Sequence, residues 1–366
     1  MASLAQRGTQ PGDYLVMSLS GPGLTVDERA FIRDVQPAGV ILFSRNIEDP
    51  DQVAILVEKL QSLASPAIWI DQEGGRVQRL RAPLTRLPPA IAYADYYRTH
   101  PQGAVELAEQ SGALCGRELA SLGIGINCAP VLDIPAPGAD PVIGNRAFGQ
   151  DPHTITTLAG AWLQGLQSSG VLGVAKHFPG HGDALVDSHK ALPVVESDEK
   201  TLWQRTWAPY RTLRGAVKAV MTAHLVMSSL DAREPATCST RVLQEGLRHR
   251  LGFAGLIISD ALEMGALSGS MEDRAARAVR AGCDQLLACT GQLDQVQRVL
   301  RGIEGAWLGK SAAQCQQERQ RIHGILEPYH PKPSSWRQVV EDPQWLELRA
   351  RLARLWDRTV GVDPTE

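Results

Sequence analysis

The chain has 366 residues, of which 43% are hydrophobic and 21% are charged, a balance typical of a globular protein with a large core. The formal net charge of −3 gives no reason to expect nucleic acid or an anionic membrane as a partner. No apolar run reaches the length of a transmembrane helix, and residues 1–12 lack the apolar core of a signal peptide. The six cysteines are scattered without a Cys-x-x-Cys pair, as expected for free thiols in the cytoplasm and not for disulfides or zinc.

Short apolar runs alternate with amphipathic segments along most of the chain. The runs are apolar on both faces and are bounded by polar residues or glycine, as buried parallel strands are. We expect strands over residues 14–18, 39–43, 67–70, 125–130, 172–175, 219–222, 256–259 and 285–288. We expect helices over residues 49–64, 105–122, 154–168, 198–214, 240–251, 271–281 and 293–303. Asp51 and Thr154 are candidate N-caps of two of these helices.

Eight strands with intervening helices predict a single (β/α)₈ barrel of the TIM type over residues 1–307. An open dinucleotide-binding sheet is less consistent, because residues 18–23 after the first strand lack its glycine pattern. Residues 72–100 are irregular and are expected to cover the mouth of the barrel. Residues 308–366 are expected to be helices packed on the barrel, with no second α/β domain.

Polar residues lie at or just after the ends of four of the predicted strands. In a barrel the carboxyl ends of the strands meet at one rim, where active sites lie. A single aspartate or histidine at such a place is often only a helix cap or a structural residue, but a set from different strands points to function. These residues are Asp71, Lys176, His177, His224 and Asp260.

The segment from Lys176 to His189 concentrates three histidines, a lysine and two aspartates among glycines and a proline. A metal site is one interpretation, with His177, His181 and nearby acids as ligands. The glycines and proline favour a mobile loop over a fixed coordination sphere, and Lys176 would bring a positive charge beside the cation. We therefore expect neither a metal nor another cofactor.

Glycosidic bond hydrolysis is the interpretation that these residues favour. The reaction needs a carboxylate at the anomeric carbon and a group that protonates the leaving oxygen. Asp260 at a strand end is the candidate nucleophile, and His189 is the candidate proton donor, since histidine titrates near neutrality. Asp187 could orient the imidazole of His189 and stabilise its protonated form.

The chain resembles the family 3 glycoside hydrolases, in particular the bacterial β-N-acetylglucosaminidases of cell-wall recycling. The similarity lies in ordered motifs, which are residues 71–79, residues 145–149, residues 176–183 with 187–189, and Ser259-Asp260 with Leu262 and Met264. One position departs from the family pattern, since Ala261 stands where many members have a second acid after the nucleophile.

The resemblance implies a role for each matching residue. Asp260 would form a covalent glycosyl-enzyme intermediate, and His189 with Asp187 would form the acid/base dyad. Terminal N-acetylglucosamine would be bound by Asp71, Arg79, Arg146, Lys176 and His177, and we count His224 among the expected substrate-binding residues. The implied substrate is N-acetylglucosaminyl-1,6-anhydro-N-acetylmuramic acid, with or without its peptide.

Other functions stay open at this point. A phosphorylase of the same family is compatible with a histidine acid, because a neutral base tolerates an anionic phosphate acceptor. A non-catalytic muropeptide sensor is less consistent, because Asp260, Asp187 and His189 are all present. An aldolase or lyase with Lys176 as a Schiff base has no support beyond that lysine. We expect a small carbohydrate or muropeptide substrate, no nucleic-acid or membrane partner, and a monomer.

Overall fold

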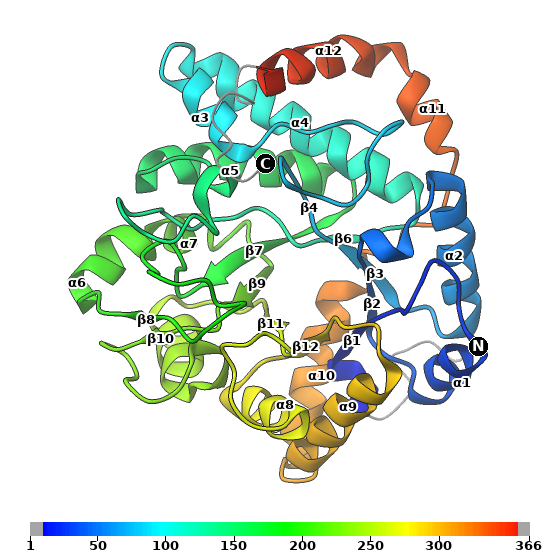
Figure 1. Ribbon diagram of the computed structural model, residues 1–366, viewed down its shortest axis with the longest axis vertical. Coiled ribbons are helices and arrows are strands. Elements are labelled where there is room, and N and C mark those ends of the chain that lie inside the picture. The colour runs from blue at the N-terminus through cyan, green and yellow to red at the C-terminus, as the bar shows by residue number, and fades with distance from the viewer. Residues whose placement is uncertain (1–9, 358–366) are drawn as a thin grey trace.

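Each of the eight predicted apolar runs forms a strand, and the eight strands close into one parallel barrel (Figure 1). The computed structural model describes residues 10–357. Residues 1–9, which are most of the segment considered for a signal peptide, lie outside the described residues, as do residues 358–366 of the expected C-terminal extension. The prediction of a (β/α)₈ barrel is confirmed.

The barrel strands consist mostly of apolar residues and are buried, apart from Asp260 and Ala261 at the end of β11, because helices cover the outside and side chains fill the inside. Around the barrel the order is β1-β12-β11-β9-β7-β6-β3-β2, so the first strand pairs with the last. The strands are β1 (Leu15–Ser18), β2 (Gly39–Leu42), β3 (Ala67–Ile70), β6 (Ile126–Asn127), β7 (Leu172–Phe178), β9 (Ala219–Thr222), β11 (Leu256–Ala261) and β12 (Gln285–Ala288).

Two small ladders stand outside the barrel, and both lie beside the strand ends that carry the predicted site. The antiparallel pair β4 (Gln72–Gly74) and β5 (Val77–Gln78) follows β3 directly. The parallel pair β8 (Val194–Val195) and β10 (Val226–Met227) fixes the end of the loop that leaves β7. The stretch 72–100, expected to be irregular, therefore contains a hairpin and also helix α3 (Ala90–Tyr97).

Helices surround the barrel on all sides in Figure 1. They are α1 (Val26–Val35), α2 (Pro50–Leu63), α3 (Ala90–Tyr97), α4 (Pro101–Ser121), α5 (Pro152–Ser168), α6 (Glu199–Thr201), α7 (Ala208–Leu213), α8 (Met271–Ala281) and α9 (Leu293–Trp307). The predicted helix 240–251 is the π-helix η7 (Arg241–Arg250), and 198–214 is divided by a second π-helix, η5 (Leu202–Thr206). Among the described residues, no helix has both the length and the apolar character needed to span a membrane.

The C-terminal helices α10 (Ala312–Leu326), α11 (Trp336–Glu341) and α12 (Pro343–Asp357) pack on the barrel at two places. Helix α10 covers the amino ends of the strands, where Arg321 pairs with the buried Asp284 just before β12. Helix α12 lies along α4 (Figure 1), with Arg349 paired to Glu118. The division of the chain at residue 307 stays a prediction.

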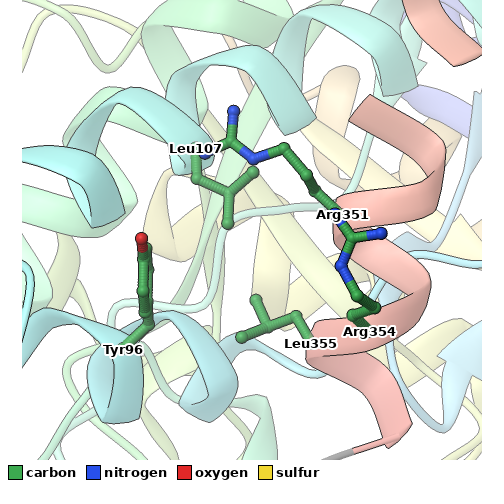
Figure 2. Close-up of a pocket in the computed structure, with 5 residues that line it drawn as sticks. All are labelled: Tyr96, Leu107, Arg351, Arg354 and Leu355. Atoms are coloured by element: carbon green, nitrogen blue, oxygen red, sulfur yellow. The ribbon is translucent and has the colours of Figure 1, made fainter. Parts of the chain in front are cut away.

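Helix α12 leaves a pocket of about 180 Å³ against α3 and α4. Figure 2 shows Arg351, Arg354 and Leu355 of α12 facing Tyr96 of α3 and Leu107 of α4 across this space. None of these five residues belongs to the predicted site, which lies at the strand ends instead.

Candidate active site

An ion-pair cluster occupies the ends of β3 and β7. The Lys176 ammonium, at the end of β7, donates to Asp71 Oδ1 at 2.8 Å and lies 2.6 Å from Glu73 Oε1. Arg79 Nη2 donates to Asp71 Oδ2 at 3.2 Å. Arg146 donates two hydrogen bonds to the Glu73 carboxylate, of 2.9 and 2.8 Å. The structure thus brings four of the predicted substrate-binding residues together, around one acid that the sequence analysis did not single out.

The cluster is fully ionised, because each buried carboxylate lies against cations. Burial alone would raise the pKa of Asp71, but Lys176 and Arg79 hold it below its ordinary value. Burial would likewise raise the pKa of Glu73, yet Arg146 and Lys176 hold it far below the ordinary range. The same carboxylates raise the pKa of Lys176 in spite of its burial. Three cations against two anions leave a formal charge of +1 on a rigid set of hydrogen-bond donors.

His177 is held by Asp133, a second acid that the sequence analysis missed. Its Nδ1 lies 2.7 Å from Asp133 Oδ2, and the Asp133 side chain has no exposed surface. Burial would raise the pKa of Asp133, but His177 keeps it below its ordinary value, so the carboxylate only accepts hydrogen bonds. Nδ1 therefore donates a proton to Asp133, and Nε2 lies 3.5 Å from Arg146 Nη2.

Asp260 lies at the carboxyl end of β11, on the same rim as the cluster. Its Oδ1 accepts a 2.7 Å hydrogen bond from the amide of Ala261, and the residue is partly buried. His224, by contrast, is fully buried, and both ring nitrogens are occupied, by Thr237 Oγ1 at 2.7 Å and by the Ala261 carbonyl at 2.9 Å. Burial lowers the pKa of His224. This geometry supports the backbone beside Asp260 and leaves no ring nitrogen of His224 free for a sugar.

Asp187 and His189 lie on the loop between β7 and β8. His189 Nδ1 is 2.7 Å from Asp187 Oδ1, and the His189 amide donates to the same oxygen at 2.9 Å. Burial opposes ionisation of Asp187, but these bonds to His189 outweigh it and lower the pKa of the carboxyl. The His189 side chain is 63% exposed, so its Nε2 can reach an entering molecule.

The loop is docked on the turn that follows Asp260. The Gly265 amide donates to the His189 carbonyl at 3.3 Å, and the Ala266 amide donates to the Ser188 carbonyl at 3.2 Å. A Cβ atom on Gly265 would lie only 2.8 Å from the His189 carbonyl oxygen, so this approach requires glycine. Residues more than seventy positions apart in the sequence are thereby held together.

Glu263 is a further acid in the same turn that the sequence analysis passed over. Burial raises the pKa of its carboxyl to about 7, and the charge of Asp260 adds to this rise. Its Oε2 is buried without a hydrogen-bond partner in the described part of the chain. Position 261 carries no second acid, but an acid does stand three residues after Asp260.

The histidines of the 176–189 segment point to separate partners. His177 binds Asp133, His181 Nε2 lies 2.9 Å from Ser188 Oγ, and His189 binds Asp187. Among residues 10–357, no three His, Cys, Asp or Glu side chains are grouped so that they could hold a metal ion.

Comparison with known proteins decides the family. The glycosyl hydrolase family 3 N-terminal domain matches residues 16–324. The chain belongs to this family. A beta-hexosaminidase from Thioalkalivibrio sulfidiphilus is 37% identical over 348 residues, which are 94% of this chain and 96% of that protein. A beta-hexosaminidase from Methylococcus capsulatus is 38% identical over 335 residues, with 89% and 97% covered.

Solved structures of family 3 enzymes have the same fold. NagZ from Neisseria gonorrhoeae, in complex with N-trifluoroacetyl-D-glucosamine, is 30% identical with a TM-score of 0.84 and covers 96% of this chain and 100% of that one. A β-N-acetylglucosaminidase from Paenibacillus sp. str. FPU-7 is 32% identical with a TM-score of 0.85, over 94% of this chain and 68% of that one. The family 3 protein is thus an enzyme, a glycoside hydrolase of the beta-hexosaminidase type, as its sequence predicted.

Proposed function

We propose that this family 3 enzyme is a retaining exo-β-N-acetylglucosaminidase of the cytoplasm that acts on peptidoglycan fragments. Its substrate would be N-acetylglucosaminyl-1,6-anhydro-N-acetylmuramic acid, with or without the peptide. The six cysteines are free and buried, in keeping with a reducing compartment. The N-trifluoroacetyl-D-glucosamine bound by the Neisseria NagZ supports an N-acylated glucosamine as the sugar.

One observation carries the proposal, namely that the Asp187–His189 pair is docked by backbone hydrogen bonds on the turn after Asp260. A carboxylate that attacks carbon and a histidine that transfers protons must face the same glycosidic bond. Among the three histidine–carboxylate pairs of the described residues, only Asp187–His189 has a largely exposed imidazole, since the His177 and His323 side chains are 8% and 22% exposed.

The reaction would run in two steps. In the first step Asp260 attacks the anomeric carbon while the protonated His189 gives its Nε2 proton to the leaving oxygen, which frees the muramic acid part. In the second step neutral His189 takes a proton from water, and the water oxygen displaces Asp260 from the sugar. Asp187 stays ionised, accepts from Nδ1 throughout and stabilises the imidazolium, so each residue returns to its starting state.

The ion-pair cluster would hold the terminal sugar. Asp71 and Glu73 can accept from hydroxyl groups, whereas Arg79, Arg146 and Lys176 can donate. The Lys176, Glu73, Arg146 and Asp71 side chains are at most 14% exposed, and so little accessible surface suits one sugar residue more than a long chain.

Product analysis tests the proposal. Purified enzyme is given the N-acetylglucosaminyl-anhydromuramyl peptide, an aryl β-N-acetylglucosaminide and an aryl β-glucoside, with and without phosphate. Free N-acetylglucosamine and the anhydromuramyl peptide are expected, with little cleavage of the glucoside. Accumulation of the sugar 1-phosphate in phosphate buffer would show a phosphorylase instead, and no turnover of any substrate would favour a sensor.

A further inference from the structure

Ser188 differs from the two residues beside it on the loop between β7 and β8. The His189 side chain is 63% exposed and that of Asp187 is 19% exposed, but Ser188 is only 3% exposed. Its Oγ lies 2.9 Å from Nε2 of His181. Together with the backbone bonds of residues 188 and 189 to residues 266 and 265, this contact fixes the stretch that carries the dyad.

His181 is itself held in place by Asp133. It is 5% exposed, and its amide donates to Asp133 Oδ1 at 2.7 Å, while the other oxygen of Asp133 binds His177. The His181 ring meets the His177 ring edge-on, with centroids 6.1 Å apart. The two oxygens of the buried Asp133 carboxylate thus hold His177 and His181.

Only one of the two ring nitrogens of His181 has a hydrogen-bond partner among the described residues. Nδ1 is buried without a hydrogen-bond partner among the described residues. A buried lone pair without a partner costs less than a buried N–H without an acceptor, so the neutral ring carries its proton on Nε2. Nε2 then donates to Ser188 Oγ. Burial lowers the pKa of His181, which keeps the ring in this neutral form.

We propose that His181 is a positioning residue for the acid/base, which acts by donating from Nε2 to Ser188 Oγ and so sets where His189 stands relative to Asp260. This inference rests on the proposed function, because it assumes that His189 transfers protons at a bond attacked by Asp260. A histidine that serves only to fill the core would contribute to stability and would affect all substrates alike. Loss of a positioning histidine slows the steps in which His189 transfers a proton and leaves the rates of the other steps unchanged.

Ser188→Ala is the first test, because it removes one oxygen and leaves the imidazole in place. We expect kcat/KM for the anhydromuramyl disaccharide to fall about tenfold, the range set by one hydrogen bond. For an aryl glycoside with a strongly activated leaving group, kcat/KM should change less than about twofold, since that bond breaks without a proton donor. Ser169→Ala, which removes a comparable hydrogen bond to the Ala113 carbonyl far from the loop, should leave both values unchanged.

Azide provides a second readout of the same position. The second chemical step needs His189 as a base for water, but azide is already an anion and needs no base. In Ser188→Ala, kcat on the activated aryl glycoside should fall because the second step is slower, although kcat/KM changes little. Azide should therefore restore this kcat and yield the glycosyl azide. His181→Gln, which keeps an N–H donor of similar reach, should lose less than His181→Phe, and His181→Phe combined with Ser188→Ala should be no worse than His181→Phe alone. If His181→Phe does not fold, Ser188→Ala alone decides.

The outcomes separate this inference from the proposed function. If His189→Ala shows the leaving-group dependence and Ser188→Ala shows none, or shows equal losses on both substrates, the positioning role is wrong and the dyad stands. If His189→Ala also lacks the dependence, the proposed acid role fails, and the inference built on it fails too.

Discussion

Among the described residues Asp260 makes no ion pair and no hydrogen bond to another side chain, and this makes its removal informative. Its Oδ1 accepts from the next amide along the chain, and the residue is partly buried. Asp260→Ala should therefore fold normally, with turnover of an aryl β-N-acetylglucosaminide reduced by about 10⁴-fold or more. Circular dichroism and steady-state rates measure both effects, and near-normal turnover would remove Asp260 as the nucleophile.

His189 is exposed and is bound to Asp187, which predicts a loss that depends on the substrate. For His189→Ala, kcat/KM on the anhydromuramyl disaccharide should fall by about 10² to 10⁴, because that leaving group must be protonated. On an activated aryl glycoside kcat/KM should fall much less. Equal losses on both substrates would count against the proton-donor role. His153→Ala, an exposed histidine at the start of α5, provides the control.

Glu263 links the site to the pH dependence of stability. Its pKa of about 7 in the folded protein exceeds the ordinary value of 4.5, so folding favours the protonated form. The stability it contributes is complete below about pH 4.5 and is lost as the pH rises through 7. At pH 8.5 the free energy of unfolding of Glu263→Gln, measured by urea denaturation, should thus exceed that of the unmodified enzyme by up to about 3 kcal/mol. At pH 5 the difference should be smaller.

The Glu263 experiment has a clear contrary result. A difference between the two proteins that is constant with pH, or is larger at pH 5, would show that Glu263 is ionised throughout. Glu347→Gln on the exposed face of α12 is the matched control and should show no such trend.

Among the elements, strands were easier to predict than helices. All eight strands were found because buried parallel strands are short, apolar runs that stand out in the sequence. Two predicted caps were wrong, since the N-caps of α2 and α5 are Asp49 and Asp151, each followed by proline. Proline suits the first helical position, so the cap is the residue before it. Helix α1, with its Thr25–Glu28 capping box, was missed.

The turn after β11 and the β7–β8 loop approach closely enough that a methyl group should separate them. In Gly265→Ala the new Cβ would lie 2.8 Å from the His189 carbonyl and 3.2 Å from that of Lys190. We expect the loop to shift and kcat/KM on the anhydromuramyl disaccharide to fall about tenfold or more. Gly305→Ala in α9, where no atom lies within 4 Å of the new group, should retain full activity; equal losses in both variants would argue against close docking.

At the scale of the whole molecule, stability and chemistry lie at opposite ends of the barrel. Asp284 lies at the amino ends of the strands and is 1% exposed. Its carboxylate accepts hydrogen bonds from Arg248 at 2.6 Å and from Arg321 of α10 at 2.9 Å. Asp284→Asn should lower the free energy of unfolding by about 3 kcal/mol, because two cations lose their buried partner. Its kcat/KM at 25 °C should not change. The exposed pair of Asp51 and Arg337 is the comparison, and Asp51→Asn should cost less than about 1 kcal/mol.

The sequence predicted which strand ends carry polar residues, but not how those residues would pair. Glu73 and Asp133 follow β3 and β6, and they went unnoticed because an acid after a strand is common. Their importance comes from burial beside Lys176, Arg146 and His177, which depends on how β3, β6 and β7 lie side by side in the barrel. The packing of α12 on α4 was equally hidden, since its contacts join residues far apart in the chain.

The loop of residues 179–193 is tethered at both ends, by β7 and by the pairing of β8 with β10. Because both ends are held, His189 stays near the barrel rim that carries Asp260 even when the backbone hydrogen bonds to residues 265 and 266 open. Such confinement acts as a high effective concentration of the acid, and it lowers the entropy lost when His189 meets the leaving group. In the proposed reaction, this tether would return the same imidazole to the glycosidic bond on every turnover.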